Sequence, residues 1–157
     1  MAGQGQYEEL ARQLSAIGAV KRELSRILPP SCPAGSAAVL HVLQRHGEMR
    51  LGRLAELLAV DVSVTSRHVT HVAERGWIER VADPGDRRSR ILRLTEDGTD
   101  VLDDLAQRYT DSLAVTLREW SDDEVGQLNT LLDRLRASFG DCRTPAAGGR
   151  TSGSSPD

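Results

Sequence analysis

The feature that most constrains the fold is a change in the spacing of apolar residues at Gly76. Before this glycine, apolar residues recur every three or four positions over residues 52–59 and 61–75, which predicts two short helices joined by a tight turn. After it, residues 77–81 and 89–94 are extended in character, and turn-forming residues between them predict a β-hairpin. A helix-turn-helix followed at once by a hairpin is therefore the expected centre of the fold.

Helices are also predicted on both sides of this centre. Residues 7–28 and 36–45 show helical spacing ahead of it. Behind it, Thr95 is expected to cap a long helix, and Ser121 opens a last helix with a capping box. We therefore predict a mainly α fold with a small β-hairpin, an α+β arrangement.

Charge is distributed unevenly along the 157 residues. The whole chain has a net charge of −3, but residues 41–95 carry ten basic and seven acidic groups, whereas residues 96–142 carry four and twelve. A basic segment beside an acidic one fits a protein that meets a polyanion with one face only. The overall negative charge therefore does not exclude a nucleic-acid partner.

The second helix of the predicted helix-turn-helix has two unlike faces. The inward spacing falls on Val62, Thr65, Val69 and Val72. The opposite face is small or hydrogen-bonding and consists of Ser63, Ser66, Arg67, Thr70 and His71, with His68 at its margin. Small residues permit close approach to the major groove of double-stranded DNA, and a guanidinium such as that of Arg67 can fork onto guanine. A polar, solvent-exposed helix is the alternative interpretation.

The predicted hairpin is rich in arginine. Arg87, Arg88 and Arg90 follow its turn directly, which is the layout of a winged helix. Arg88 at the tip could enter a minor groove, where a narrow A·T tract concentrates negative potential. Asp86 is expected to orient this arginine by a local ion pair. The alternative is a solvated turn with no partner.

These segments together resemble the MarR family of winged-helix transcriptional regulators. The resemblance covers about residues 34–98 and rests on Leu54-Ala-Glu-Leu-Leu58, Val62-Ser-Val-Thr-Ser-Arg-His-Val69, Glu74-Arg-Gly-Trp-Ile-Glu-Arg80, Asp83-Pro-Gly-Asp-Arg-Arg88 and Leu94-Thr-Glu-Asp-Gly98. It implies a homodimer with one winged helix-turn-helix lobe per subunit and a palindromic operator. It also implies a repressor from which a small ligand or an oxidant releases the DNA.

The same resemblance implies roles for individual residues. Arg88 corresponds to the wing arginine and Asp86 to its partner. The recognition-helix residues that it implies are Ser63, Thr65, Ser66, Arg67 and Thr70.

The aliphatic stripes of the terminal helices support dimerisation independently. A monomer would leave more than a dozen of their large aliphatic side chains partly in water, and exposed apolar area on that scale marks an interface. The predicted organisation is an N-terminal dimerisation helix and loop (1–33), a DNA-binding lobe (34–98), C-terminal dimerisation helices (99–142) and a tail (143–157). The tail lacks apolar periodicity and is predicted to be disordered.

A sensor site is the least determined part of the sequence. We expect an apolar pocket for an aromatic or phenolic ligand, with Ile17, Cys32, His41, Arg108 and Tyr109 as candidate contacts. A thiol-based redox sensor at Cys32 is an alternative, although this cysteine lies after the first helix and not near its start. Zinc bound by Cys32, His41 and Glu23 would have at most three ligands, so no metal or cofactor is predicted.

The chain carries no motif that predicts catalysis. Phosphate-binding, serine-lysine and His-Glu-x-x-His patterns are all missing from it, so we predict that it is not an enzyme. It also has no secretory signal and no apolar stretch long enough to span a bilayer, which predicts a cytoplasmic location. The alternative function is a winged-helix dimerisation or interaction module that binds no DNA.

Overall fold

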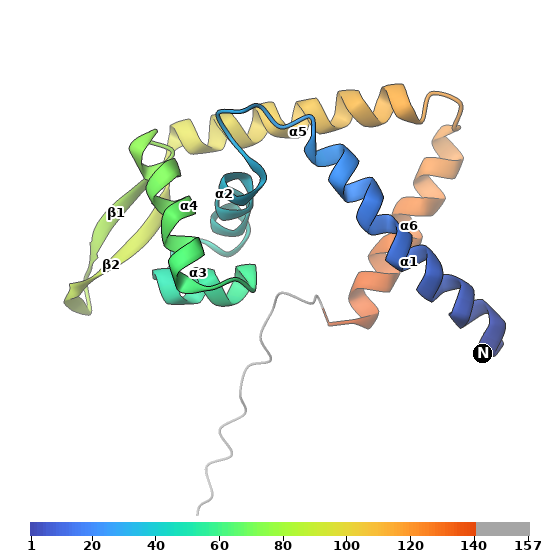
Figure 1. Cartoon of the computed structure of the whole chain (residues 1–157), viewed down its shortest axis with the longest axis horizontal. Coiled ribbons are helices and arrows are strands. Elements are labelled where there is room, and N and C mark those ends of the chain that lie inside the picture. Colours follow the sequence, from blue (N-terminus) through green and yellow to red (C-terminus); the bar gives the residue numbers. More distant parts are fainter. Residues whose placement is uncertain (141–157) are drawn as a thin grey trace, which may run out of the picture. The chain divides into compact units, whose positions relative to one another are not determined.

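A computed structural model of the protein describes residues 1–140. Figure 1 shows the order of its helices and strands. They are α1 (Gln4–Ser25), α2 (Ala34–His46), α3 (Leu51–Leu58), α4 (Val62–Glu74), β1 (Ile78–Asp83), β2 (Asp86–Leu94), α5 (Glu96–Thr116) and α6 (Asp122–Ser138). The predicted fold class is confirmed, and every predicted helix and strand is present with boundaries that differ by a few residues. The predicted disorder of residues 143–157 lies outside the described residues.

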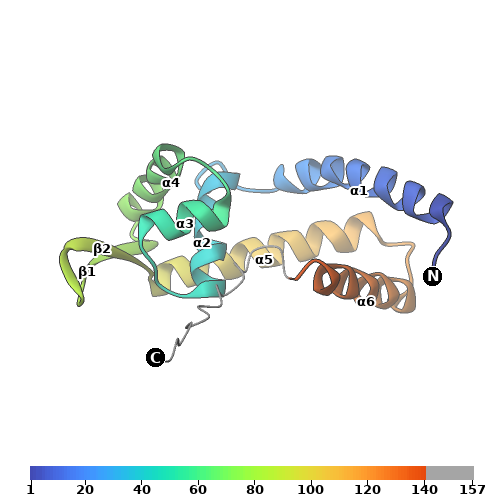
Figure 2. The same ribbon diagram turned by 90° about the horizontal axis from the view of Figure 1, so that it is seen from below.

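The chain forms two compact units, Met1–Arg118 and the part from Glu119 onward. Within the first unit, α3, α4 and the hairpin gather around α2 at the N-terminal end of α5, as both views show (Figures 1 and 2). Helix α5 therefore belongs to the same unit as the helix-turn-helix. The finer division into four parts remains a prediction.

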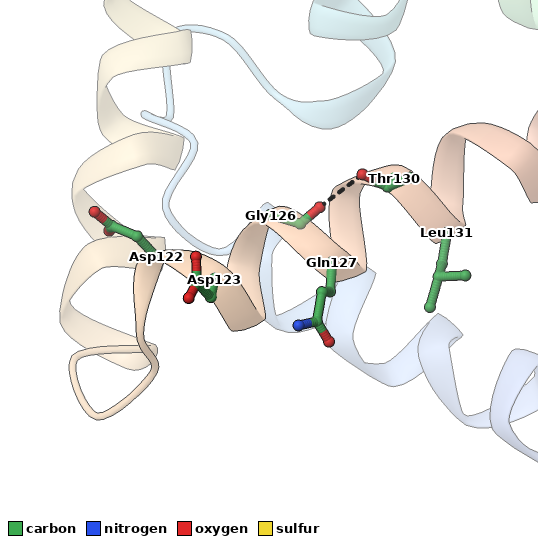
Figure 3. A pocket seen from close by; sticks show the side chains of 6 residues that line it. All are labelled: Asp122, Asp123, Gly126, Gln127, Thr130 and Leu131. Carbon is green, nitrogen blue, oxygen red and sulfur yellow. Dashed lines mark hydrogen bonds between the residues drawn. The ribbon is translucent and has the colours of Figure 1, made fainter.

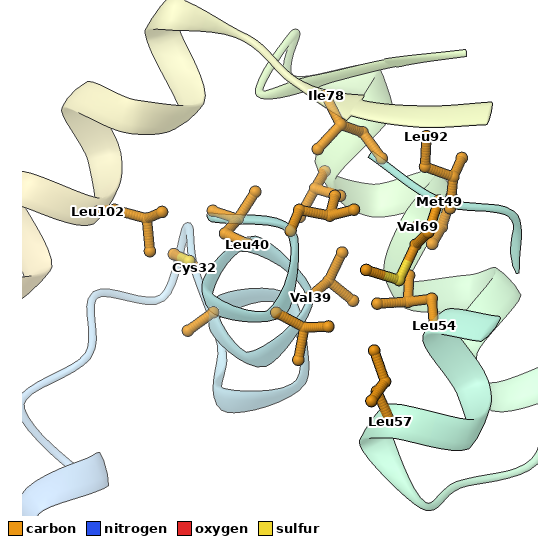
Figure 4. Close-up of a cluster of buried hydrophobic side chains, with 14 of the residues drawn as sticks. Cys32, Val39, Leu40, Met49, Leu54, Leu57, Val69, Ile78, Leu92 and Leu102 are labelled. Carbon is orange, nitrogen blue, oxygen red and sulfur yellow. The ribbon is translucent and has the colours of Figure 1, made fainter. Parts of the chain in front are cut away.

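The core of the first unit is built around α2. Val39 and Leu40 of α2 are completely buried and pack with Leu54 of α3, Val72 of α4 and Leu102 of α5. Figure 4 shows Leu40, Leu54 and Leu102 within this cluster of buried side chains, with Cys32 on the side nearest α5. Burial of this aliphatic set is the main stabilising contribution to the lobe.

The hairpin is an antiparallel pair with one irregularity. Ile78 lies opposite Leu94, and a register shift falls between Ala82 and Asp83. Met49, just before α3, adds a short bridge to β2: its N–H donates to the Leu92 carbonyl at 3.2 Å and its carbonyl accepts from the Leu92 N–H at 2.8 Å. The hairpin is thus attached to the helix-turn-helix by backbone bonds.

The two ends of the hairpin are joined at one point. Gly76 ends α4 with φ +75°, the left-handed conformation expected there. The Thr95 hydroxyl donates to the Gly76 carbonyl at 2.6 Å and accepts from the Gly98 N–H at 3.1 Å, which confirms the predicted cap of α5. A Cβ on Gly98 would lie 2.1 Å from the Trp77 carbonyl oxygen, so only glycine permits this approach.

The terminal helices α1 and α6 differ from the lobe in having no buried residue. The predicted capping box of α6 is confirmed: Ser121 accepts from the Glu124 N–H, and the Glu124 carboxylate accepts from the Ser121 N–H at 2.8 Å. The pKa of Glu124 is lowered below its ordinary value by the bond from the Ser121 N–H and then by the bond from the Ser121 hydroxyl, which also donates to this carboxylate at 3.0 Å. No helix among residues 1–140 is long and apolar enough to cross a membrane.

Candidate nucleic-acid interface

The outer face of α4 carries the side chains that the sequence assigns to DNA reading. Ser63, Arg67 and Thr70 are exposed, and Ser66 is half-buried. The Arg67 guanidinium makes no hydrogen bond or ion pair within residues 1–140, so its five donors are available to a ligand. Thr70 accepts a bond from the Arg80 guanidinium of β1 at 3.3 Å, which joins this face to the hairpin.

Two assignments on α4 need correction. Thr65 has no exposed surface, and its hydroxyl donates to the Asp61 carbonyl at 3.0 Å, so it cannot contact DNA. The inward expectation for this residue was correct. Val62, expected to point inward, is 53% exposed because it occupies the first turn of the helix, beyond the edge of the core.

The two histidines of α4 also face differently from the prediction. His71 is half-buried, and its Nδ1 lies 2.8 Å from the hydroxyl of Ser36, a fully buried residue of α2. Its ring meets Trp77 edge-on. The His68 ring lies against Gly35 so closely that a Cβ there would come within 2.2 Å of it. Both histidines therefore dock α4 on α2, and neither belongs to the outer face.

The wing exposes its arginines but holds Asp86 in an unexpected way. One carboxylate oxygen of Asp86 accepts from the Arg88 backbone N–H at 3.0 Å, and the other from the Ser89 hydroxyl at 3.0 Å. These bonds, the backbone bond first, lower the pKa of Asp86. The predicted ion pair with the Arg88 guanidinium is wrong, because Asp86 braces the backbone of the turn instead. Arg87, Arg88 and Arg90 are exposed.

Sequence reasoning missed a second acidic residue of the wing. Asp83 accepts from Nε of Arg50 at 2.8 Å and also from Nη2 of the same guanidinium. The Gly85 N–H donates to its other oxygen at 2.9 Å. The Gly85 bond and then the Arg50 bond lower the pKa of Asp83. The two paired residues lie 33 positions apart, so only their opposite charges could have suggested the contact.

A cavity of about 310 Å³ lies between the loop before α2 and the first half of α5. Its lining consists of Pro29, Ser31, Cys32, Trp77, Asp100, Val101, Asp104, Leu105 and Arg108. It includes two of the five predicted pocket residues, Cys32 and Arg108. The other three, Ile17, His41 and Tyr109, do not line it. Arg108 donates to Asp104 at 2.8 Å, within the wall.

Cys32 is poorly suited to act as a reactive thiol. It is only 1% exposed, and this burial raises its pKa, an effect that the charge of Arg75 opposes more weakly. A raised pKa disfavours the thiolate, which is the reactive form. Among residues 1–140, no three side chains of His, Cys, Asp or Glu form a group that could hold a metal ion, the set Cys32, His41 and Glu23 included.

The hollow beside α6 is not comparable with this cavity. Its lining residues are Asp122, Asp123, Gly126, Gln127, Thr130 and Leu131, which Figure 3 shows along one helix. The one bond drawn there, from the Thr130 hydroxyl to the Gly126 carbonyl at 2.9 Å, lies within the helix itself. Since all its lining residues are exposed, we do not consider it a site.

A helix-turn-helix with a free arginine on its second helix, followed by an arginine-rich hairpin, defines the class of winged-helix DNA-binding proteins. Comparison with known proteins specifies the group. Residues 34–89 match the model of the MarR family. The chain is 30% identical over 104 residues to the HTH-type transcriptional regulator YxaD of Bacillus subtilis, which covers 66% of this chain and 73% of YxaD. It therefore belongs to the MarR family of transcriptional regulators.

Other relatives and solved structures agree. The multiple antibiotic resistance protein MarR of Salmonella typhimurium is 32% identical over 83 residues, or 52% of this chain and 58% of that protein. A MarR family protein from Bacillus stearothermophilus has a TM-score of 0.74 at 24% identity, covering 89% of this chain and 99% of that one. A mutant MarR from Escherichia coli, complexed with operator DNA, has a TM-score of 0.59 at 23% identity, covering 82% of this chain and 96% of that one. The structures support the fold.

Proposed function

We propose that this regulator binds a palindromic operator as a homodimer and acts as a repressor that a small ligand releases. The observation that carries the proposal is the free guanidinium of Arg67 on the outer face of α4, within the same compact unit as the exposed wing arginines. A donor fork on a recognition helix and a second set of guanidinium groups on a wing are the groups that read a major groove and enter a minor groove.

The DNA contacts that we propose come from two elements. On α4 they are Ser63, Ser66, Arg67 and Thr70, and on the wing Arg87, Arg88 and Arg90. Arg67 is assigned to base reading and the hydroxyls to phosphates or base edges. His68, His71 and Asp86 act indirectly, by holding α4 and the wing turn in position.

Homodimerisation is supported by the apolar surface of the terminal helices. On α1, Leu10, Leu14, Ile17 and Val20 are all exposed, and so are Leu128, Leu131 and Leu132 on α6. Apolar surface of this extent is unfavourable in water, and a second copy of the chain would cover it. A twofold dimer on B-DNA presents its two recognition helices about 34 Å apart.

The cavity between the loop before α2 and α5 is the proposed effector site. It offers Trp77, Val101 and Leu105 to an apolar ligand. Trp77 also contacts His71 of α4 and carries the Arg75 guanidinium over its ring at 5.7 Å. A ligand that moves Trp77 would therefore disturb the C-terminal end of the recognition helix, which is a physical route to release of the DNA.

The test is selection of duplexes from a random-sequence pool by the purified full chain, followed by titration of the selected duplex. Arg67→Ala should weaken binding by about 1–3 kcal/mol and relax the sequence preference, and Arg88→Ala should weaken it and reduce the salt dependence. Arg12→Ala removes an exposed arginine of α1 that is paired with Glu9 and should leave binding unchanged. If Arg67→Ala and Arg88→Ala bind as tightly as the parent chain, the proposal is wrong and an interaction module without DNA becomes the better explanation.

A further inference from the structure

The ion pair between Arg50 and Asp83 joins two elements that are both needed for DNA binding. Arg50 is the residue that precedes α3, so it lies at the start of the helix-turn-helix. Asp83 is the last residue of β1, at the root of the wing turn. Two guanidinium nitrogens of Arg50 converge on Oδ2 of Asp83. The wing turn is thus bonded directly to the helix-turn-helix.

Asp83 is fully engaged by this arrangement. Its Oδ2 receives Arg50, and its Oδ1 receives the backbone N–H of Gly85 in the turn. The Asp83 side chain is only 14% exposed, whereas that of Arg50 is 52% exposed. One carboxylate therefore connects the arginine to the backbone of the turn from which Arg87 and Arg88 follow.

The surrounding backbone explains why such a bond is needed. The register of the hairpin shifts between Ala82 and Asp83, so the regular ladder is interrupted at the root of the turn. The neighbouring attachment is the bridge between Met49 and Leu92, which lies further from the tip. Beyond the interruption, the Arg50 bond is a side-chain contact that ties the turn to the rest of the lobe.

We propose that Arg50 is a positioning residue for DNA binding, which fixes the orientation of the wing through Asp83 and need not contact DNA itself. The inference rests on the proposed function, because it assigns the wing arginines a place on DNA. A loosened wing would have to be ordered when DNA binds, and the ordering cost would weaken binding. Asp83, although it is an acid beside a polyanion, then contributes favourably to affinity.

If Arg50 instead contacted a DNA phosphate directly, the Asp83→Asn variant would bind DNA more tightly rather than more weakly. If Arg50 held a phosphate, Asp83→Asn would free the guanidinium and remove a negative charge, and binding would strengthen. If Arg50 positions the wing, Asp83→Asn should weaken binding despite that loss of charge. The asparagine oxygen can still accept from the Gly85 N–H, so the substitution removes chiefly the Arg50 bond.

The experiment compares Asp83→Asn, Arg50→Gln and the double variant on the selected duplex and on a fixed random 30-base-pair duplex at low salt. The matched control is Glu79→Gln, which breaks the exposed cross-strand pair of Glu79 with Arg93 and removes the same charge from the hairpin. We expect each single variant to lose about three- to tenfold in affinity and the double variant to lose no more, because coupled residues are not additive. Unchanged or tighter binding by Asp83→Asn would overturn the proposal.

A measurement without DNA separates this proposal from the proposed function. In the free protein, amide hydrogen exchange over residues 85–90 should quicken in Asp83→Asn and Arg50→Gln and stay unchanged in Glu79→Gln. Unaltered exchange in both variants refutes the positioning role, whatever the DNA result. Faster exchange in a chain that binds neither duplex would support the wing anchor while refuting the DNA-binding function.

Discussion

The winged-helix lobe and the terminal helices carry similar aliphatic patterns but bury them to very different degrees. In α2, Val39 and Leu40 are completely buried. In α1 and α6 no residue is buried, and side chains as large as Leu14 and Leu131 are exposed. The lobe therefore completes its own core within one chain, whereas the apolar stripes of α1 and α6 are exposed among residues 1–140.

This difference separates two sources of stability. The lobe should be stable as a property of the single chain, since its apolar side chains pack on each other. The terminal helices should gain stability only when a partner covers their stripes, and stability of that kind depends on protein concentration. Three measurements on the isolated protein, taken in decreasing order of expected effect, would sharpen or break this division.

The largest effect is expected in the lobe. Leu40→Ala should lower the free energy of unfolding by about 2–5 kcal/mol, because it removes a completely buried side chain and leaves a cavity. Urea unfolding at two protein concentrations should give the same loss at both. Leu131→Ala on α6, where the side chain is exposed, should show a cost only at concentrations at which the proposed dimer forms. A large, concentration-independent cost for Leu131→Ala would show that one chain buries it.

A smaller effect is expected from a charge on the stripe of α1. Leu14→Glu should raise the dissociation constant of the proposed dimer by about 100-fold, because a carboxylate would be buried in its apolar interface. Sedimentation velocity would measure this constant. Ala19→Glu places the same charge on the other side of α1 and should leave the constant unchanged. Equal effects of both variants would mean that the stripe is not the interface.

The smallest effect is expected from acid. The pKa values of Asp83 and Asp86 in the wing, and of Glu124 in the α6 cap, are lowered in the folded protein by the hydrogen bonds that each accepts. Their stabilising contributions are complete above the ordinary pKa values of 3.8 and 4.5 and are lost as the pH falls through the lower, folded values. The wing turn and the α6 cap should therefore loosen in acid before the aliphatic core does.

A carboxyl titration followed by NMR would check this order. Asp83, Asp86 and Glu124 should remain ionised at a pH where an ordinary carboxyl group is half protonated. Titration of these three groups at the ordinary pKa values of 3.8 for Asp and 4.5 for Glu would remove the basis for a wing held by its acidic residues.

Local signals were enough to predict the elements of the fold. Gly76, Thr95 and the capping box at Ser121 each act within a few residues of their own position, so the helix ends and the hairpin could be read from the sequence. Which residues form the candidate site was harder to predict from the sequence. Whether a residue of α4 points inward depends on how the helix is docked, and adjacent positions differ by about 100° around its axis.

The errors at the site follow from this limit. Val62 satisfies the spacing of the inward face, but the core ends before the first turn of α4, so the side chain is exposed. His71 lies on the polar side of the pattern, yet a buried hydroxyl on α2 draws it inward. Asp83 and Arg50 meet only after the chain has folded. Contacts between elements distant in sequence leave no periodic signal.

The hydrogen bonds of Thr95 connect α4, the hairpin and α5 at one position. Thr95 is the N-cap of α5, and its hydroxyl donates to the carbonyl of Gly76 at the end of α4. Its backbone N–H donates to the carbonyl of Trp77 at 3.0 Å. One group of hydrogen bonds thus joins the C-terminal end of α4, the two ends of the hairpin and the first turn of α5. A rotation of α5 about its axis would therefore move α4 and the wing together, because both are hydrogen-bonded to its N-terminal cap.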